Sequence, residues 1–327
     1  MQNNVVTNNF SSAKEMNYTS KLFISPPENY ALALIISLQI VFGTILNAVI
    51  IVTILLGQKR HDKTPSDIMV LNLSIADLLP CLTFLPRITL QLIQGWEREP
   101  TRYFFVTLLC FLFHCCEHAV FAVTIDRYIG ICYPLHYKSI MTPKKTFVLS
   151  FLIWGGSFIF GVSEIASCYL ELSGSMGLFH CILSFLEMVI ILFMYGTIFD
   201  QMKRQHNRIS LEDCNQSNRR RRIQNHRKLY ILVKYANKPF AITLLYLLTF
   251  LPISLSSIVL FSRRNNGEGF DDVSRIWFWR LCCFTFLNSC INPIVYSFKN
   301  ARFRRSFSRM IKSLRQNWMV ILKKHRD

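Results

Sequence analysis

Seven long runs of apolar residues alternate with shorter polar segments along this chain of 327 residues. Each run has the roughly 20 residues that an α-helix needs to cross the hydrocarbon core of a bilayer. The pattern therefore predicts an all-α membrane protein, built as a bundle of seven transmembrane helices. The predicted spans lie near residues 30–56, 67–93, 103–133, 146–170, 178–202, 229–261 and 276–298.

Beyond the seventh run the pattern becomes amphipathic, with apolar residues at helical spacing and basic residues between them. The apolar positions are Phe303, Phe307, Met310, Ile311, Leu314 and Trp318. We expect a short eighth helix that lies on the cytosolic face of the membrane and contacts its lipids. The chain then divides into an N-terminal tail at 1–29, the helical bundle at 30–299, and the amphipathic helix with its tail at 300–327.

Composition and charge agree with this reading, since 51% of the residues are hydrophobic and only 17% are charged. Lys and Arg collect in the loops after the first, third and fifth runs and in the C-terminal segment. Short basic loops stay in the cytosol, so these segments are expected inside and the N-terminus outside. Asn9 and Asn17 begin glycosylation sequons in that outer tail. The net charge of +18 is then mostly a topology signal that favours anionic lipid over nucleic acid as its partner.

Polar residues interrupt the apolar runs at a few places. Asp77 lies in the middle of the second run, and Asp126-Arg127-Tyr128 closes the third. Ionisable side chains in such places are costly, so each is a functional candidate with a partner expected nearby. Amide side chains that could donate to Asp77 stand in the first and seventh runs: Asn47, Asn288 and Asn292.

These residues together resemble the rhodopsin-like (class A) G-protein-coupled receptors over about residues 30–310. The positions that follow the order and spacing of that family are Asn47, Asp77, Asp126-Arg127-Tyr128, Trp154, Pro252 and Asn292-Pro293-x-x-Tyr296. The resemblance implies a multi-pass receptor of the plasma membrane and not an enzyme. It would bind an extracellular ligand and activate a heterotrimeric G protein through outward movement of the sixth helix.

The resemblance also implies roles for single residues. Asp126 would hold Arg127 at rest as a charge-assisted pair. On activation Arg127, Tyr195 and Tyr296 would line a cytosolic cavity for the C-terminal helix of a Gα subunit. The residues similar to the family's sodium pocket are Asn47, Asp77, Cys116, Asn288 and Asn292. Cys116 stands where the family has serine, and sulfur is a poor ligand for a hard cation, which disfavours a sodium ion there. No other cofactor is expected.

The chain departs from the family pattern at its outer disulfide and in its fifth helix. Arg102 occupies the outer cysteine position of the third helix. Cys168 and Cys181 flank a short outer segment and are a candidate disulfide instead. The missing bridge and a fifth helix without proline are similar to melanocortin-like members of the family.

A three-residue switch joins the third, fifth and sixth helices in the family, and here it becomes Glu117, Glu187 and Tyr246. Two neighbouring acids repel unless one holds a proton, so proton sensitivity is one hypothesis. The alternative is a neutral Glu187 that faces donors such as Tyr246. Phe250 replaces the usual tryptophan before Pro252. The cytosolic end of the sixth helix has no acid to hold Arg127, so raised basal activity is expected.

The ligand class stays open after two exclusions. Leu109 occupies the place where amine receptors have an aspartate, and Phe286 occupies the place of the opsin lysine. Peptides, lipids, nucleosides and other small molecules remain. The candidate pocket residues are Leu109, Cys110, Phe113, Phe250, Ser254, Trp279 and Cys282.

Two other classes of protein match parts of the sequence. His114-x-x-Glu117-His118 matches a zinc-peptidase motif, in which two histidines one turn apart bind metal and the glutamate acts as base. An intramembrane metalloenzyme would need a third ligand and access for water. A channel or transporter is the second alternative, although the two halves of the chain show no internal repeat.

Overall fold

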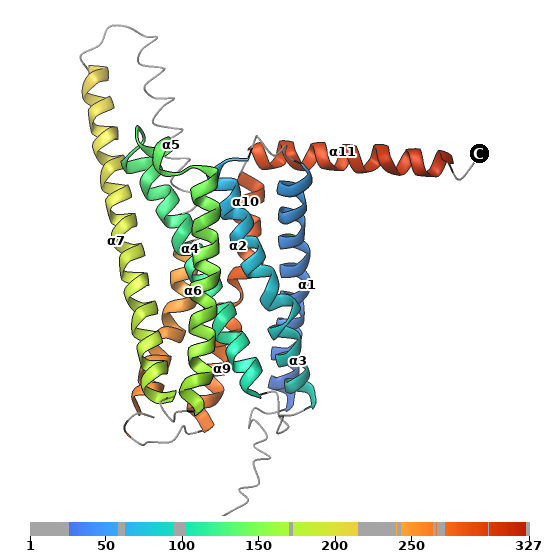
Figure 1. The fold of residues 1–327 in the computed structure, drawn as a ribbon, viewed down its shortest axis with the longest axis vertical. Coiled ribbons are helices and arrows are strands. Elements are labelled where there is room, and N and C mark those ends of the chain that lie inside the picture. Colours follow the sequence, from blue (N-terminus) through green and yellow to red (C-terminus); the bar gives the residue numbers. More distant parts are fainter. Residues whose placement is uncertain are drawn as a thin grey trace, which may run out of the picture.

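A computed structural model describes residues 26–57, 63–94, 102–169, 173–214, 240, 243–263, 266, 272–299 and 301–324. All regular elements within these residues are α-helices, and they form one elongated bundle (Figure 1). The helices that build the spans are α1 (Pro26–Leu56), α2 (Pro65–Leu82), α3 (Phe84–Gln94), α4 (Arg102–Cys132), α6 (Pro143–Tyr169), α7 (Ser173–Cys214), the helix Thr243–Arg263, α9 (Asp272–Thr285) and α10 (Asn288–Lys299). We name the helix Thr243–Arg263 the sixth span.

Six spans among the described residues are long and apolar enough to cross a membrane, with α2 and α3 counted as one. The seventh position is filled by α9 and α10. The short helix α5 (Tyr137–Ile140) follows α4 and lies at the same end of the bundle as α11 (Ala301–Lys324) (Figure 1). We name this the α11 end, and the other the opposite end. The predicted order of apolar helices is therefore confirmed for the described residues.

Two predicted helices are broken in the structure. The second span changes direction at Thr83, three residues after Pro80. The seventh is interrupted between Thr285 and Asn288, where the Leu287 N–H bonds to the Phe284 carbonyl three residues back. Apolar periodicity does not register such local breaks, because both halves remain hydrophobic.

Prolines free two backbone carbonyls inside the bundle, and neighbouring helices satisfy both. A proline at position i has no N–H for the carbonyl at i−4. Pro80 thus frees the Ala76 carbonyl, which accepts from Cys116 Sγ at 3.3 Å. Pro293 frees the Ser289 carbonyl, which accepts from Asn47 Nδ2 at 2.7 Å. Cys116 and Asn47 therefore supply hydrogen bonds to the two carbonyls that the prolines leave without a backbone donor.

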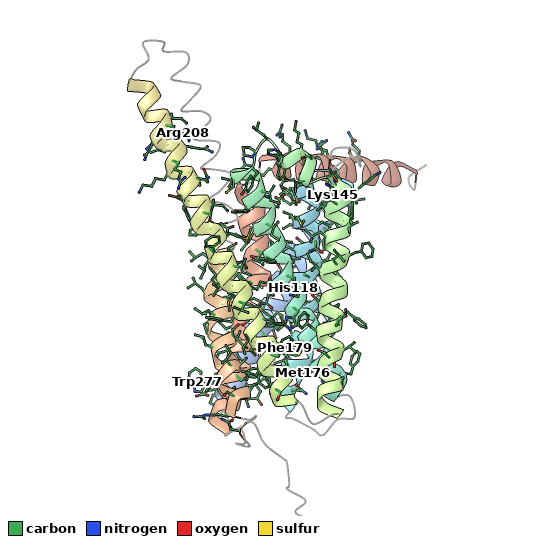
Figure 2. The ribbon with its side chains drawn as sticks, turned by 60° about the vertical axis from the view of Figure 1, so that its left-hand side comes forward. His118, Lys145, Met176, Phe179, Arg208 and Trp277 are labelled. Carbon is green, nitrogen blue, oxygen red and sulfur yellow. The ribbon has the colours of Figure 1, made fainter. Side chains whose placement is uncertain are left out.

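Large apolar side chains cover the outside of the bundle. Phe151 of α6 is 80% exposed and Phe193 of α7 is 73% exposed. Figure 2 shows many side chains projecting from the helices on this side of the bundle. Soluble monomers rarely expose apolar surface on this scale, whereas a bilayer solvates it. The buried core lies between α2, α4, α6, α7 and the sixth span.

The predicted amphipathic helix is present as α11 and runs away from the bundle at a steep angle to its axis (Figure 1). With 24 residues it is longer than the short helix we predicted. Phe303 and Met310 are buried, whereas Arg304 and Arg305 are exposed. α11 approaches α1 closely at Gly57, where a Cβ atom would lie 2.7 Å from a backbone oxygen of α11.

Candidate functional site

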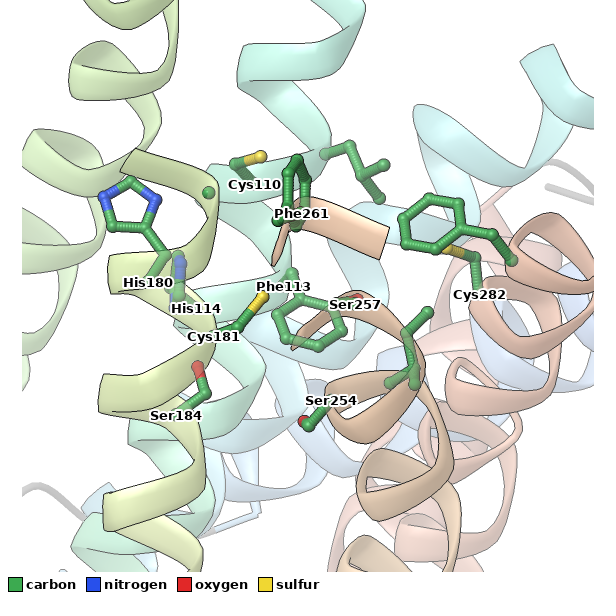
Figure 3. Close-up of a pocket in the computed structure, with 14 residues that line it drawn as sticks. Cys110, Phe113, His114, His180, Cys181, Ser184, Ser254, Ser257, Phe261 and Cys282 are labelled. Carbon is green, nitrogen blue, oxygen red and sulfur yellow. The ribbon is translucent and has the colours of Figure 1, made fainter. Parts of the chain in front are cut away.

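A cavity of about 110 Å³ lies between α4, α7, the sixth span and α9, toward the opposite end (Figure 3). Of the predicted pocket residues, five line it: Leu109, Cys110, Phe113, Ser254 and Cys282. The Trp279 side chain lies outside the described residues. Residues that the sequence analysis missed are His114, Gly177, His180, Cys181, Ser184, Ile253, Ser257, Phe261 and Phe278. The α4 positions could be found by counting back from Arg127, but α7 offers no comparable landmark.

The described lining residues carry two imidazoles, three hydroxyls and three thiols, and none of them is Asp, Glu, Lys or Arg. α7 approaches the sixth span closely, because Gly177 faces the Phe261 ring. A Cβ atom at Gly177 would lie 2.5 Å from that ring. The cavity is thus mostly apolar, with His114, His180 and Ser184 gathered on its α4 and α7 side (Figure 3).

Glu117 lies just beneath the cavity, only 1% exposed, and joins three helices. Its carboxylate contacts His114 Nδ1 at 3.1 Å in α4. It also accepts from Ser184 Oγ of α7 at 2.8 Å and from Tyr246 OH of the sixth span at 3.1 Å. The predicted association of Glu117 with Tyr246 is present. Glu187 contacts His118 Nε2 at 3.5 Å and lies near enough to Glu117 and Tyr246 to interact with them electrostatically, although the hydrogen bond of Tyr246 goes to Glu117.

The histidines beside Glu117 are held by hydroxyl groups of α6. His118 Nδ1 lies 3.0 Å from Ser157 Oγ, and His180 Nε2 lies 3.1 Å from Ser163 Oγ. Figure 2 places His118 near mid-height of the bundle. Within the described part of the chain, no group of three His, Cys, Asp or Glu side chains has the arrangement that a metal ion needs.

Aromatic rings continue from the cavity into the core. The ring of Phe113, which lines the cavity, lies 4.8 Å from that of Phe250. Phe250 in turn lies 4.4 Å from Tyr246. Pro252 follows two residues later in the same helix. The sixth span therefore contacts Phe113 of the cavity wall and Glu117 through two aromatic residues one turn apart.

Hydroxyl groups carry the contacts onward to the α11 end. The Thr243 hydroxyl donates to Tyr195 OH at 3.1 Å and lies 3.4 Å from the Thr124 hydroxyl. Tyr195 also lies close enough to Arg127 for the two to interact electrostatically. Tyr128 points elsewhere and packs on Tyr133 with ring centroids 6.0 Å apart.

Asp126 and Arg127 form an ion pair at 3.5 Å. The shorter contacts of Asp126 go to groups that the sequence analysis missed. Its carboxylate accepts from Tyr137 OH of α5 at 2.7 Å and from Ser66 Oγ of α2 at 2.9 Å. Asp126 is thus held by three groups.

Asp77 accepts from Asn292 Nδ2 at 2.9 Å and from Ser289 Oγ at 3.1 Å. Ser289 was missed, although it stands one turn before Asn292 on the same helical face. Two expected donors are engaged elsewhere: Asn288 Nδ2 donates to Thr249 Oγ1 at 2.5 Å, and Asn47 donates to backbone carbonyls.

The sodium-like pocket around Asp77 can be tested against these contacts. Both Asp77 oxygens already accept hydrogen bonds, and the Cys116 thiol lies beside them. The buried Oδ1 atoms of Asn47 and Asn292 have no hydrogen-bond partner in the protein, which a water molecule would satisfy. Sulfur in the donor set fits a hard cation poorly. The arrangement suits bound water better than sodium.

Some predicted residues lie outside the described part of the chain. They are Asn9, Asn17 and the side chains of Cys168, Trp279 and Tyr296. Trp154, in contrast, lies where a helix contact was expected, and its Nε1 donates to the buried Asn72 at 2.7 Å.

Comparison with known proteins gives one family and several distant relatives. Residues 46–296 match the family described as 7 transmembrane receptor (rhodopsin family). The alpha-1A adrenergic receptor of Oryzias latipes is 26% identical over 329 residues, which cover 86% of this chain and 66% of that protein. The galanin receptor type 2 of Rattus norvegicus is 25% identical over 309 residues, covering 88% of this chain and 77% of that receptor. The chain therefore spans about two thirds of the length of the adrenergic relative.

Proposed function

The chain belongs to the rhodopsin family of seven-transmembrane receptors, and on that premise we propose a specific signalling role for it. It binds an extracellular ligand in the cavity near the opposite end of the bundle. Ligand binding moves the sixth span outward at the α11 end, where Arg127 contacts a heterotrimeric G protein. The protein has no enzymatic role in this proposal.

The proposed orientation puts the α11 end in the cytosol of a plasma-membrane receptor. The basic loops and α11 lie on the cytosolic side in this arrangement, as the positive-inside rule requires. The N-terminal tail is then extracellular, and Asn9 and Asn17 can carry glycans. Removal of N-glycans should lower the apparent mass of the wild type but leave that of an Asn9→Gln/Asn17→Gln variant unchanged. A wild-type protein that carries no glycan while on the cell surface would weaken the proposal.

One observation carries the signalling proposal: a series of buried contacts leads from the cavity toward Arg127. Phe113 at the cavity packs on Phe250, and Phe250 packs on Tyr246. One turn further, Thr243 of the same helix donates to Tyr195, which lies near Arg127. A shift of the sixth span would change both ends of this series together.

The cavity favours a small, largely apolar ligand without a strong charge. Its volume of about 110 Å³ is below the roughly 300 to 1,000 Å³ of typical ligand pockets. An amine ligand would need a carboxylate, and Leu109 occupies the position expected for one. Among the classes left open by the sequence, we favour a small non-amine molecule over a peptide. The hydroxyls of Ser254 and Ser257 supply hydrogen bonds on the side of the sixth span.

A panel of G-protein dissociation sensors in transfected cells tests the proposal. Each Gα class is read first without ligand and then against peptide and small-molecule libraries, with Arg127→Ala as the paired variant. A cavity ligand should lose potency on Phe113→Ala but not on Phe151→Ala, since Phe151 faces the lipid. Silence of every Gα class despite confirmed surface expression would refute the coupling role.

A further inference from the structure

The histidines of this chain are unevenly placed. Of the five histidines that the structure describes, three lie within the helical bundle, and these three share one cluster with Glu117 and Glu187. The rings of His114 and His118 stack with centroids 5.7 Å apart, and His180 lies edge-on to His114 at the same distance. Five ionisable side chains thus meet in one buried region, which we name the acid–imidazole cluster.

Every helix packed around Glu117 places polar groups in this cluster or beside it. α4 supplies His114, His118 and the thiols of Cys115 and Cys116, while α7 supplies His180, Glu187 and Ser184. The sixth span supplies Tyr246. α6 supplies the hydroxyls of Ser157 and Ser163, and its described charged side chains, Lys144 and Lys145, stand at the far end of that helix. α2 supplies Asp77, which lies beyond Cys116.

The cluster is connected to the cavity. His114, His180 and Ser184 line the cavity wall and also contact Glu117 or another member of the cluster. In the proposed orientation this cavity lies on the extracellular side. Imidazole is the side chain whose charge ordinarily changes between pH 5 and 8. Because these side chains contact one another, a proton that one of them binds changes the charge that its neighbours face.

We infer that the acid–imidazole cluster is a proton-binding site that controls the sixth span. This inference rests on the proposed signalling function. Ionised Glu117 accepts from donors on three helices, and its charge strengthens the bond that ties Tyr246 to α4. A proton that enters through the cavity binds an imidazole of the cluster, and the positive charge beside Glu117 then offsets the charge of the carboxylate. The Tyr246 bond then weakens, and the sixth span is released toward its active position.

The size of the effect follows from this one bond. A hydrogen bond to a charged group is roughly twice as strong as a neutral one, which corresponds to about a fivefold change in the balance between two states. Ligand-free signalling should therefore rise about fivefold as the external pH falls through the imidazole range. Glu117→Gln removes the carboxylate charge at every pH, and Tyr246→Phe removes the donor. Both variants should signal strongly at pH 8 and respond little to acid.

The first measurement is G-protein dissociation in cells between external pH 8 and 5.5, corrected with untransfected cells. His206→Gln serves as the control, because this exposed histidine of α7 lies far from the cluster. It should keep the pH response of the wild type. A wild-type signal that is present but flat with pH would overturn the proton site and leave the receptor role standing. If no variant signals at any pH, the signalling role itself has failed.

The second measurement needs no signalling and uses purified full-length protein in nanodiscs. The thermal midpoint of the wild type should fall between pH 8 and 5.5. The midpoint of the His206→Gln control, measured at the same pH values, should fall by the same amount. Glu117→Gln and Tyr246→Phe should start lower at pH 8 and change less with acid. Midpoints of all four proteins that change in parallel with pH would overturn the proton site. Two variants guard against the case in which one of them fails to fold.

Discussion

The contact between Asn47 and the Ser289 carbonyl offers a sharp test of how the bundle tolerates its seventh-helix proline. Pro293 cannot donate to that carbonyl, and Asn47 Nδ2 does so at 2.7 Å. Asn47→Ala would leave the Ser289 carbonyl buried without a donor, which in soluble proteins lowers the free energy of unfolding by about 1–3 kcal/mol. Hydrogen bonds inside membrane proteins average about 0.6 kcal/mol, so about 1 kcal/mol is the expected loss. The thermal midpoint should fall by roughly 2–4 °C.

A double-mutant cycle isolates the cause. Pro293→Ala restores a backbone N–H that can reach Ser289, so Asn47→Ala should cost much less in that background. Thermal unfolding of the purified protein, followed by tryptophan fluorescence, gives the four midpoints. Ser37→Ala is the control, since within the described residues that α1 hydroxyl donates to Ala33 of its own helix, and its effect should add independently. Equal losses from Asn47→Ala with and without Pro293 would refute the reasoning.

Three further predictions concern the two ends and the middle of the bundle. Tyr137→Phe removes a donor from Asp126, so the carboxylate should bind Arg127 more closely. Ligand-free G-protein signalling should then fall, by up to about tenfold. An unchanged or higher signal at equal surface expression would contradict this. Replacing sodium chloride with choline chloride should change the thermal midpoint of the purified protein by less than about 1 °C, because the side chains around Asp77 suit a water molecule better than sodium. A clear rise of the midpoint with sodium would show a cation site. The structure has Cys181 as a thiol in the cavity wall, contrary to the disulfide with Cys168 that we expected, so mass mapping of non-reduced protein should find Cys181 alkylated, and a Cys168–Cys181 bridge would contradict the structure.

Sequence reasoning predicted the helices because a membrane imposes a simple length rule. An apolar run of some 20 residues must satisfy its backbone internally, and a helix does so. The breaks at Thr83 and before Asn288 were not predicted, since both halves of each span remain apolar. The donors that Cys116 and Asn47 supply to the Ala76 and Ser289 carbonyls were not predicted either, because they come from other helices.

The candidate site was predictable where a nearby landmark fixed the register. Counting from Arg127 placed Leu109, Cys110 and Phe113 on the face of α4 that lines the cavity. α7 lacks a proline landmark, and its wall residues were missed. His180 and Ser184 stand one turn apart on one face, a spacing that could have found them.

The partners of single charges were harder to predict than their positions. Asp126 was expected to bond chiefly to Arg127, yet its shorter contacts are to Ser66 and Tyr137. Both come from other segments of the chain and are ordinary polar residues by themselves. Only their placement beside a buried carboxylate gives them a role, and that placement is a property of the packed bundle.

Nucleotide exchange by purified heterotrimeric G proteins tests the central claim most directly. The full-length chain is reconstituted in nanodiscs, and exchange is measured for each Gα class with wild type and with Arg127→Ala. We predict ligand-free exchange above the receptor-free rate for at least one class, and its loss in Arg127→Ala at equal receptor amount. Exchange at the receptor-free rate for every class, or a rate that Arg127→Ala leaves unchanged, would contradict the account.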